Sequence, residues 1–274
     1  MSRLPPLRDV IRRHDLSARK GLGQHFLLDF NLIRRITRVA GDVSRGTTIE
    51  IGPGPGGLTR TLLEAGACVT AIEKDHRCLD ALAEVKDAYP ARLDVVSEDA
   101  LNCNFTKIGT APRRVVANLP YNIASELIVR WLNHPECFES LTVMVQKEVA
   151  ERLAAEPGSK SYGRLSVLAG WRWHVSLAFD VHRKAFTPPP KVDSTVVHMT
   201  PRAKPLANAE SETLSRVTEA AFGQRRKMLR SSLKPLGDSE NLCESAGVEP
   251  RKRAEQITVE GFCAIARAVD NNAC

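Results

Sequence analysis

The tetrapeptide Asn118-Leu119-Pro120-Tyr121 has the residue types that hold a planar base carrying an exocyclic amine. The Asn118 side-chain oxygen and the Leu119 carbonyl can each accept a hydrogen bond from that amine, and the Tyr121 ring can stack on the base. Proline restricts the residue before it, so Pro120 holds the Leu119 carbonyl in one orientation. The pattern predicts capture of a flipped base after the apolar run 115–117. An ordinary strand followed by a turn is the alternative.

A glycine loop at residues 52–57 follows the β-branched run 47–51, the first predicted strand, and opens an amphipathic stretch. Its glycine spacing fits the dinucleotide fingerprint, and Glu73 follows at the end of the next predicted strand. However, Pro53 and Pro55 have no N–H groups, so the loop is poor in the donors that a pyrophosphate needs. Adenosylmethionine has no phosphate, and the Glu73 carboxylate can accept both of its ribose hydroxyls. The loop therefore favours adenosylmethionine, with a plain strand-to-helix turn as the alternative.

Three further segments carry candidate ligand contacts. Asp99 directly follows the third predicted strand, where it can accept from an adenine amine or remain a solvated carboxylate. Residues 20–29 contain two glycines that indicate backbone packed against a ligand, and they include His25, whose alternative is a surface position. Phe186 lies in a proline-stiffened loop that would offer a second stacking ring at low entropic cost, or would plug the core.

Composition points to a polyanionic partner. The 274 residues have a formal net charge of +7 and a pI near 9.2, which favours nucleic acid over an acidic small molecule. We find no long apolar run and no secretion leader, so we expect a cytoplasmic protein with no membrane contact. The seven cysteines form no Cys-x-x-Cys pair, which predicts reduced thiols and no metal site.

Alternating short β-branched runs and amphipathic stretches predict an α/β fold. The expected strands form a mostly parallel seven-stranded sheet of the Rossmann-like class I methyltransferase type, and the last two are expected to pair antiparallel. They cover residues 47–51, 68–73, 93–97, 115–117, 141–145, 173–179 and 194–199.

The chain is predicted to divide into a cofactor-binding domain at residues 1–200, a linker at 201–208 and a small all-helical domain at 209–274. An apolar stripe from Val217 to Leu233 predicts one continuous helix. Basic side chains beside this stripe are expected to contact RNA phosphates, with a solvated face as the alternative. The basic residues are Arg225, Arg226, Lys227 and Arg230. Shorter helices are expected around residues 239–246 and 259–269.

The ordered motifs resemble those of the bacterial KsgA/RsmA-type ribosomal RNA adenine dimethyltransferases over nearly the whole chain. The matching segments are Gly23-Gln-His-Phe-Leu27, Glu50-Ile-Gly-Pro-Gly54, Ile72-Glu73, Asp99-Ala100, Asn118-Leu-Pro-Tyr-Asn-Ile123, Gln146-Lys-Glu-Val149, Ser161-Tyr-Gly-Arg-Leu-Ser166, Phe186-Thr-Pro-Pro-Pro-Lys-Val-Asp-Ser194 and Phe222-Gly-Gln-Arg-Arg-Lys227.

The resemblance implies dimethylation of N6 on two adjacent adenosines in the 3′-terminal hairpin of 16S ribosomal RNA. The partner would be the immature small ribosomal subunit, with a role late in its assembly, and the protein would be a monomer. The implied adenosylmethionine contacts are His25, Leu27, Gly52, Glu73, Asp99 and Asn118. His25 stands where the family often has Asn, so a backbone contact is expected there.

Three other functions remain open from the sequence. The first is dimethylation of large-subunit RNA by a related resistance enzyme, against which the match at residues 222–227 and the long helical tail argue. The second is a non-catalytic RNA-binding or transcription-accessory relative, which the intact motif at residues 118–121 disfavours. The third is a nicotinamide dehydrogenase, disfavoured by the prolines of the glycine loop.

Overall fold

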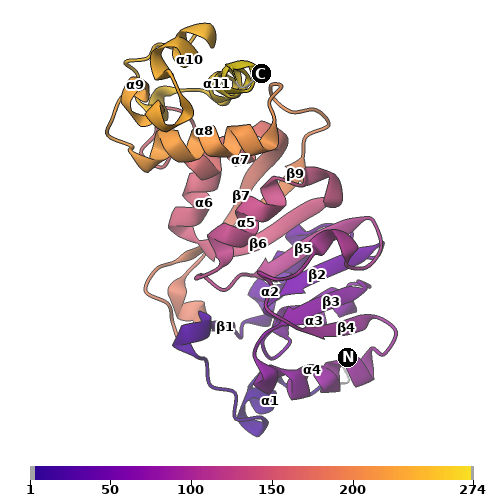
Figure 1. The fold of residues 1–274 in the computed structure, drawn as a ribbon. Coiled ribbons are helices and arrows are strands. Elements are labelled where there is room, and N and C mark those ends of the chain that lie inside the picture. The colour runs from indigo at the N-terminus through magenta and orange to yellow at the C-terminus, as the bar shows by residue number, and fades with distance from the viewer. Residues whose placement is uncertain (1–3, 273–274) are drawn as a thin grey trace. The chain divides into compact units, whose positions relative to one another are not determined.

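The computed structural model describes residues 4–272, so Cys274 lies outside the described residues. Figure 1 shows a layered α/β region at indigo to pink and a helical region at orange to yellow. Contacts divide the chain into two compact units. The first holds the described residues up to Arg130, with Glu136–Ala150 and Ser176–Thr200, and the second holds Trp131–Pro135, Glu151–Val175 and the residues from Pro201.

The sheet has seven strands in the order β4-β3-β2-β5-β6-β9-β7. Their bounds are β2 Thr47–Ile51, β3 Val69–Glu73, β4 Leu93–Ser97, β5 Arg113–Asn118, β6 Ser140–Gln146, β7 Trp173–Val181 and β9 Ser194–Pro201. Strands β2 to β6 pair in parallel, whereas β9 is antiparallel to β6. This confirms the predicted class I methyltransferase sheet, and β7 and β9 are hydrogen-bonded neighbours as expected.

Strand β2 lies at the point where the strand order reverses. From β2 the chain adds β3 and then β4 on one side, and β5 and β6 on the other. The parallel strands present their carboxyl ends at one edge, where Ile51, Glu73, Ser97 and Asn118 end β2, β3, β4 and β5. In open α/β sheets such a switch point is where ligands bind.

Helices follow most of the strands. Those before residue 160 are α1 Leu7–Arg13, α2 Phe30–Val39, α3 Gly57–Glu64, α4 His76–Ala88, α5 Ala124–Leu132 and α6 Lys147–Leu153. Asp29 and Asp75 cap α2 and α4 by accepting hydrogen bonds from backbone N–H groups of the first turn, which satisfies donors that the helix itself leaves unpaired. Helix α3 starts after Gly56, whose φ of +84° suits glycine.

A two-residue ladder joins segments far apart in the sequence. Strand β1, Phe26–Leu27, pairs antiparallel with β8, Phe186–Thr187, so that Leu27 lies opposite Phe186. Leu27 and Phe186 both belong to the main hydrophobic core, together with Ile33 and Val196. The ladder therefore fixes the proline loop against the N-terminal segment. Neither strand was expected from the sequence.

The second unit is mostly helical. Its helices include α7 Arg164–Arg172, α8 Ser211–Gly223, α9 Leu229–Ser232, α10 Ser239–Ser245 and α11 Val259–Asn272. Residues 201–208, expected to be a linker, hydrogen-bond α7: Leu206 N–H donates to the Trp171 carbonyl, and Trp171 Nε1 donates to the Ala207 carbonyl. This segment is therefore held on its own unit.

The prediction of one continuous helix from Val217 to Leu233 is wrong. Helix α8 ends at Gly223, and residues 224–227 form a turn. Met228 instead makes an antiparallel bridge to Arg253, and Leu229 N–H donates to the Lys252 carbonyl at 2.8 Å. Pairing with a distant segment thus replaces the helical hydrogen bonds that the periodicity predicted.

The six described cysteines are free thiols. Within residues 4–272, no helix combines the length and apolarity needed to cross a membrane.

Candidate active site

One cavity at the carboxyl edge of the sheet brings together nearly all the residues that the sequence singled out for chemistry. It lies within the first unit and is lined by His25, Leu27, Gly52, Glu73, Asp99, Asn118, Leu119, Pro120 and Tyr121, among others. These residues come from β1 and the residue before it, from the loop after β2, from the ends of β3 and β5, and from the segments after β4 and β5. Their convergence follows from the parallel strand order.

Glu73 is 5% exposed and ends β3. Its Oε2 accepts from the Gly54 N–H at 2.9 Å, and its Oε1 accepts from the Asp75 N–H at 2.7 Å. Burial raises the pKa of Glu73, and these backbone donors oppose that effect. Each carboxylate oxygen has a second lone pair, so a fixed Glu73 can still accept from two hydroxyl groups.

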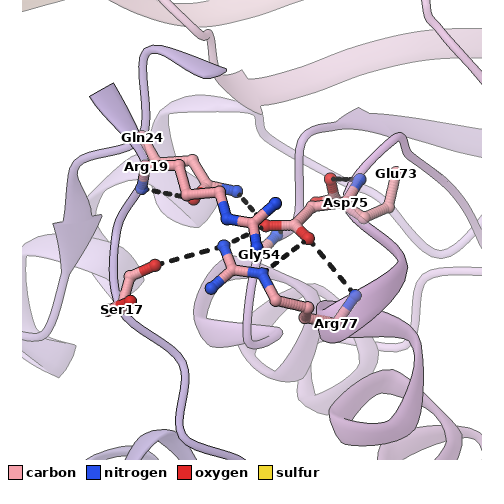
Figure 2. A network of polar contacts seen from close by, with 7 residues as sticks. All are labelled: Ser17, Arg19, Gln24, Gly54, Glu73, Asp75 and Arg77. Atoms are coloured by element: carbon pink, nitrogen blue, oxygen red, sulfur yellow. Dashed lines mark hydrogen bonds and ion pairs between the residues drawn. The ribbon is translucent and has the colours of Figure 1, made fainter. Parts of the chain in front are cut away.

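Asp75 ties the N-terminal segment to this carboxylate (Figure 2). Its Oδ2 accepts from Gln24 Nε2 at 2.9 Å and from Arg77 Nη2 at 2.6 Å, while Arg77 also donates to the Ser17 carbonyl. Burial opposes ionisation of Asp75, but the hydrogen bonds from Arg77 and Gln24 outweigh it and lower the pKa to about 2. Residues 17–24 are therefore held beside Glu73 by a charged group.

The glycine loop is shaped by close approaches. A Cβ on Gly52, whose φ is +63°, would lie 3.2 Å from Pro120, and a Cβ on Gly54 would lie 3.2 Å from the Phe26 ring. The Gly54 N–H is already donated to Glu73. Together with Pro53 and Pro55, this leaves few loop donors for a phosphate, as the sequence predicted.

Glu50 is a cavity residue that the sequence analysis did not single out. It is 1% exposed within β2, and its Oε2 has no hydrogen-bond partner among the described residues. Burial raises the pKa of Glu50 to about 8. The sequence signal that could have found it was a carboxyl group between Ile49 and Ile51 of a predicted strand, because a buried carboxyl oxygen without a partner is costly.

Asp99 follows β4 and lines the same cavity. Its Oδ2 accepts from Lys74 Nζ at 2.6 Å, and its Oδ1 accepts from the Leu101 N–H at 3.0 Å. The hydrogen bond from Lys74 lowers the pKa of Asp99. Asp99 is therefore an ionised acceptor at neutral pH.

These groups fit adenosylmethionine. The buried carboxyl groups of Glu50 and Glu73 suit a ligand that carries positive charge and ribose hydroxyls, and the loop is poor in the donors that phosphate requires. Asp99, at the neighbouring strand end, can accept from an exocyclic amine. The orphaned oxygen of Glu50 is the feature that most needs a ligand partner.

Asn118 ends β5 with a defined amide orientation. Its Nδ2 donates to the His25 carbonyl at 3.2 Å. The Asn118 side-chain oxygen is therefore the end that remains to accept from a substrate amine. The next residue, Leu119, is held by its N–H, which donates to the Met144 carbonyl on β6. Hydrogen bonds thus hold both the side-chain amide of Asn118 and the backbone of Leu119.

Tyr121 is held at its hydroxyl and at its ring. The hydroxyl lies 2.6 Å from Ser194 Oγ on β9, and the ring centroid lies 5.4 Å from that of His25 with 30° between the planes. Burial raises the pKa of Tyr121. The ring is therefore a rigid neutral surface beside Asn118.

Phe186 is placed differently from the expected stacking ring. It is 2% exposed, belongs to the hydrophobic core, and is not among the described residues that line the cavity. This placement matches the alternative of a core plug. The β1–β8 ladder, which draws Phe186 against Leu27, is the physical reason. Stacking of Phe186 on a base would require this ladder to move.

The predicted RNA-contacting residues lie in the second unit, in the turn after α8 and in α9. All four, Arg225, Arg226, Lys227 and Arg230, are exposed. The bridge between Met228 and Arg253 brings a second exposed basic run beside them, which the sequence analysis missed although it is visible as three consecutive basic residues: Arg251, Lys252 and Arg253.

Two of these basic side chains also have internal contacts. Arg225 Nε lies 3.1 Å from Glu255 Oε2, and its Nη2 donates to the Lys160 carbonyl. Arg230 Nη1 lies 3.7 Å from Glu240 Oε1. These contacts hold the segment after α8 in place, so Arg225 has a structural role in addition to its charge.

Comparison with protein families matches residues 15–271 to the model described as "Ribosomal RNA adenine dimethylase". The "Ribosomal RNA small subunit methyltransferase A" of Rhodospirillum rubrum is 60% identical over 268 residues, which cover 97% of this chain and 93% of that protein.

Two solved structures are similar in fold. A dimethyladenosine transferase from Plasmodium falciparum is 26% identical with a TM-score of 0.73, over 91% of this chain and 98% of that one. The 23S rRNA methyltransferase ErmE is 28% identical with a TM-score of 0.66, over 89% of this chain and 99% of that one.

Proposed function

Because the chain belongs to the ribosomal RNA adenine dimethylase family, we propose that it dimethylates N6 of two adjacent adenosines in the 3′-terminal hairpin of 16S ribosomal RNA. The enzyme is an adenosylmethionine-dependent ribosomal RNA adenine dimethyltransferase. The choice of the small subunit is supported by the name of the Rhodospirillum rubrum relative at 60% identity. The proposed substrate particle is an immature small subunit in the cytoplasm, on which the protein acts as a monomer late in assembly.

The observation that carries this proposal is the orientation of Asn118. The N6 lone pair of adenine is delocalised into the ring, so the amine is a poor nucleophile until its hydrogens are held out of the ring plane. The Asn118 side-chain oxygen and the Leu119 carbonyl are two acceptors in one cavity, and each belongs to a group that a hydrogen bond holds in place. Accepting both N6 hydrogens would aim the lone pair at the methyl donor, and such positioning supplies much of a rate enhancement.

The cofactor side would be held by the residues that the resemblance implied. Glu73 would accept the ribose hydroxyls, Asp99 the adenine amine, and Gly52 would let the ligand approach the backbone. Leu27 and the backbone of His25 line the same cavity and would complete the cofactor contacts. When bound, adenosylmethionine supplies a methyl group on positively charged sulfur. No general base is needed before transfer, because the amine proton becomes acidic only when nitrogen carries positive charge.

The target base would reach the cavity only after leaving its stack, and unpaired hairpin adenines cost least to extract. Tyr121 is the ring placed to stack on it, and base–aromatic stacking contributes roughly 1–3 kcal/mol per base. A contribution from Phe186 remains part of the proposal only if RNA binding opens the β1–β8 ladder.

The RNA itself would be gripped through its phosphates by the basic turn after α8. The second basic run, Arg251 to Arg253, lies beside that turn and extends the same surface. Phosphate contacts position a protein on nucleic acid without reading its sequence. This is consistent with base choice being made at Asn118 and Tyr121.

The main alternative function is dimethylation of large-subunit RNA, which the similarity to the 23S rRNA methyltransferase ErmE supports. The test is incubation of the protein and labelled adenosylmethionine with small subunits and with large subunits from cells that lack the enzyme. We expect N6,N6-dimethyladenosine at two adjacent positions of the small-subunit hairpin. Label in large-subunit RNA would overturn the small-subunit assignment, and no label in either RNA would favour a non-catalytic relative.

A further inference from the structure

We propose that the His25 side chain is a positioning residue for the target base, holding the Tyr121 ring through one contact and the proline loop through another. The inference rests on the proposed function and deepens it. The resemblance assigned His25 to the cofactor. The contacts of its imidazole instead lead to the residues on the base side of the cavity.

The β1–β8 ladder places His25 for this task. Phe26 lies opposite Thr187 in an antiparallel pair, so the register continues with His25 opposite Pro188. The His25 Nδ1 lies 2.8 Å from the Pro188 carbonyl. A carbonyl can only accept, so Nδ1 carries the hydrogen and the ring is fixed in one rotation.

The fixed imidazole then packs on Tyr121. Their centroids are 5.4 Å apart, which is the separation of aromatic rings in direct contact. A base cannot enter between them, so the pair is not a sandwich. His25 supports one side of the Tyr121 ring, while Ser194 holds its hydroxyl at 2.6 Å. Two side chains from different segments thus restrain the ring that would stack on the base.

The backbone of the same residue sets the other half of the site, because the His25 carbonyl accepts from Asn118 Nδ2. The approach depends on Gly23. Its φ is +63°, and a Cβ there would lie 2.7 Å from Asn122 Oδ1. A glycine at this position therefore lets residues 23–25 lie against residues 118–122. His25 joins the proline loop, the Tyr121 ring and the Asn118 amide.

Three substitutions of His25 distinguish its side-chain contact with Pro188 from that with Tyr121. All three keep the His25 backbone carbonyl. His25→Asn places an amide nitrogen where Nδ1 stands, so it keeps the bond to Pro188 and loses the ring. His25→Phe keeps a ring against Tyr121 and loses the donor. His25→Ala loses both. With undermethylated small subunits and saturating cofactor, we expect the single-turnover rate to fall roughly 10- to 100-fold for His25→Ala, and less for the other two.

Calorimetric affinity for adenosylmethionine should be unchanged in all three variants. The rate loss from His25→Ala should largely vanish when Tyr121 is already alanine, because the residue acts through that ring. Cofactor affinity that falls in step with the rate, combined with additive effects of the two substitutions, would overturn the proposal and return His25 to the cofactor site.

A second measurement does not depend on turnover. The chain has three tyrosines, so a spectrum of ¹³C-tyrosine-labelled protein is simple, and Tyr121→Phe assigns one signal. We expect His25→Ala to shift the Tyr121 signal and leave those of Tyr89 and Tyr162 in place. An unmoved Tyr121 signal would refute the positioning contact. If the Tyr121 signal moves in His25→Ala but the parent protein methylates no ribosomal RNA, the proposed function alone would be refuted.

Discussion

The side-chain nitrogen of Asn118 donates to the carbonyl oxygen of His25 at 3.2 Å, and this turns the Asn118 side-chain oxygen into the available acceptor. The donor end of the amide is thus used for orientation, and the acceptor end is the one that we propose receives the substrate amine. In that proposal a single asparagine at the end of β5 joins the N-terminal segment to the reacting amine.

Asn118→Ala is expected to lower the single-turnover methylation rate by about 10²- to 10³-fold, the usual loss when one preorganised hydrogen-bonding group is removed. RNA affinity should persist, because the proposed phosphate contacts lie in the second unit. Asn102→Ala is the matched control, since Asn102 is exposed and lies outside the described lining of the cavity. If Asn118→Ala methylated RNA at a near-parental rate with saturating cofactor, the orientation argument would be contradicted.

Glu73→Ala is expected to weaken adenosylmethionine binding strongly. Charge-assisted hydrogen bonds to hydroxyl groups contribute about 1.5–3 kcal/mol each, so the loss of one or two should reduce affinity by at least about tenfold. Calorimetry measures the effect directly. Glu64→Ala, an exposed acid of α3, serves as the control. Unchanged affinity in a folded Glu73→Ala protein would show that the ribose is held elsewhere.

Glu50 should make stability depend on pH. Burial raises its pKa in the folded protein to about 8 from 4.5. Below pH 4.5 both folded and unfolded chains are protonated there, and the stability is fully present. As pH rises toward 8, the unfolded chain ionises first, so the free energy of unfolding falls by at most about 1.4 kcal/mol per pH unit.

Glu50→Gln has no such ionisation, so its free energy of unfolding should rise relative to the parent between pH 5 and 8. Urea unfolding at several pH values in this window measures the difference in free energy of unfolding between the two proteins. The test is how this difference changes with pH, so a constant effect of the substitution on stability does not matter. Glu64→Gln is expected to follow the parent. Parallel curves for the parent and Glu50→Gln would mean that Glu50 is already ionised in the folded protein.

The two basic runs are expected to set the salt dependence of RNA binding. Neutralising each phosphate-contacting side chain should reduce the slope of log affinity against log salt by about 0.7–0.9. The variant replaces four exposed residues by glutamine, namely Arg226, Lys227, Arg251 and Lys252. Arg225 is kept because it pairs with Glu255.

The control for this experiment removes four exposed basic residues of the first unit, namely Arg8, Arg12, Arg38 and Lys107. It should leave the slope close to the parental value. If both variants changed the slope equally, RNA binding would depend on net charge alone. A parental slope in the first variant would make the runs ordinary solvated surface.

Those features of the protein that have a local physical cause could be predicted from the amino-acid sequence. Short β-branched runs between amphipathic stretches predicted β2 at Thr47–Ile51 and β4 at Leu93–Ser97 with their observed bounds. The family resemblance implied that Gly52, Glu73 and Asn118 contact one cofactor, and one cavity is lined by all three, because the parallel strands that carry them end at one edge of the sheet.

Features that depend on pairing between distant segments could not be predicted in this way. The periodicity of residues 217–233 is helical, but bonds from Leu229 and Arg230 to residues 250–252 satisfy the same backbone groups and end the helix at Gly223. Pairing of β1 with β8 likewise buries Phe186 and turns His25 toward Pro188. The local residue pattern specifies which hydrogen bonds a segment can make within itself. A distant segment that competes for the same backbone groups comes close only when the chain folds.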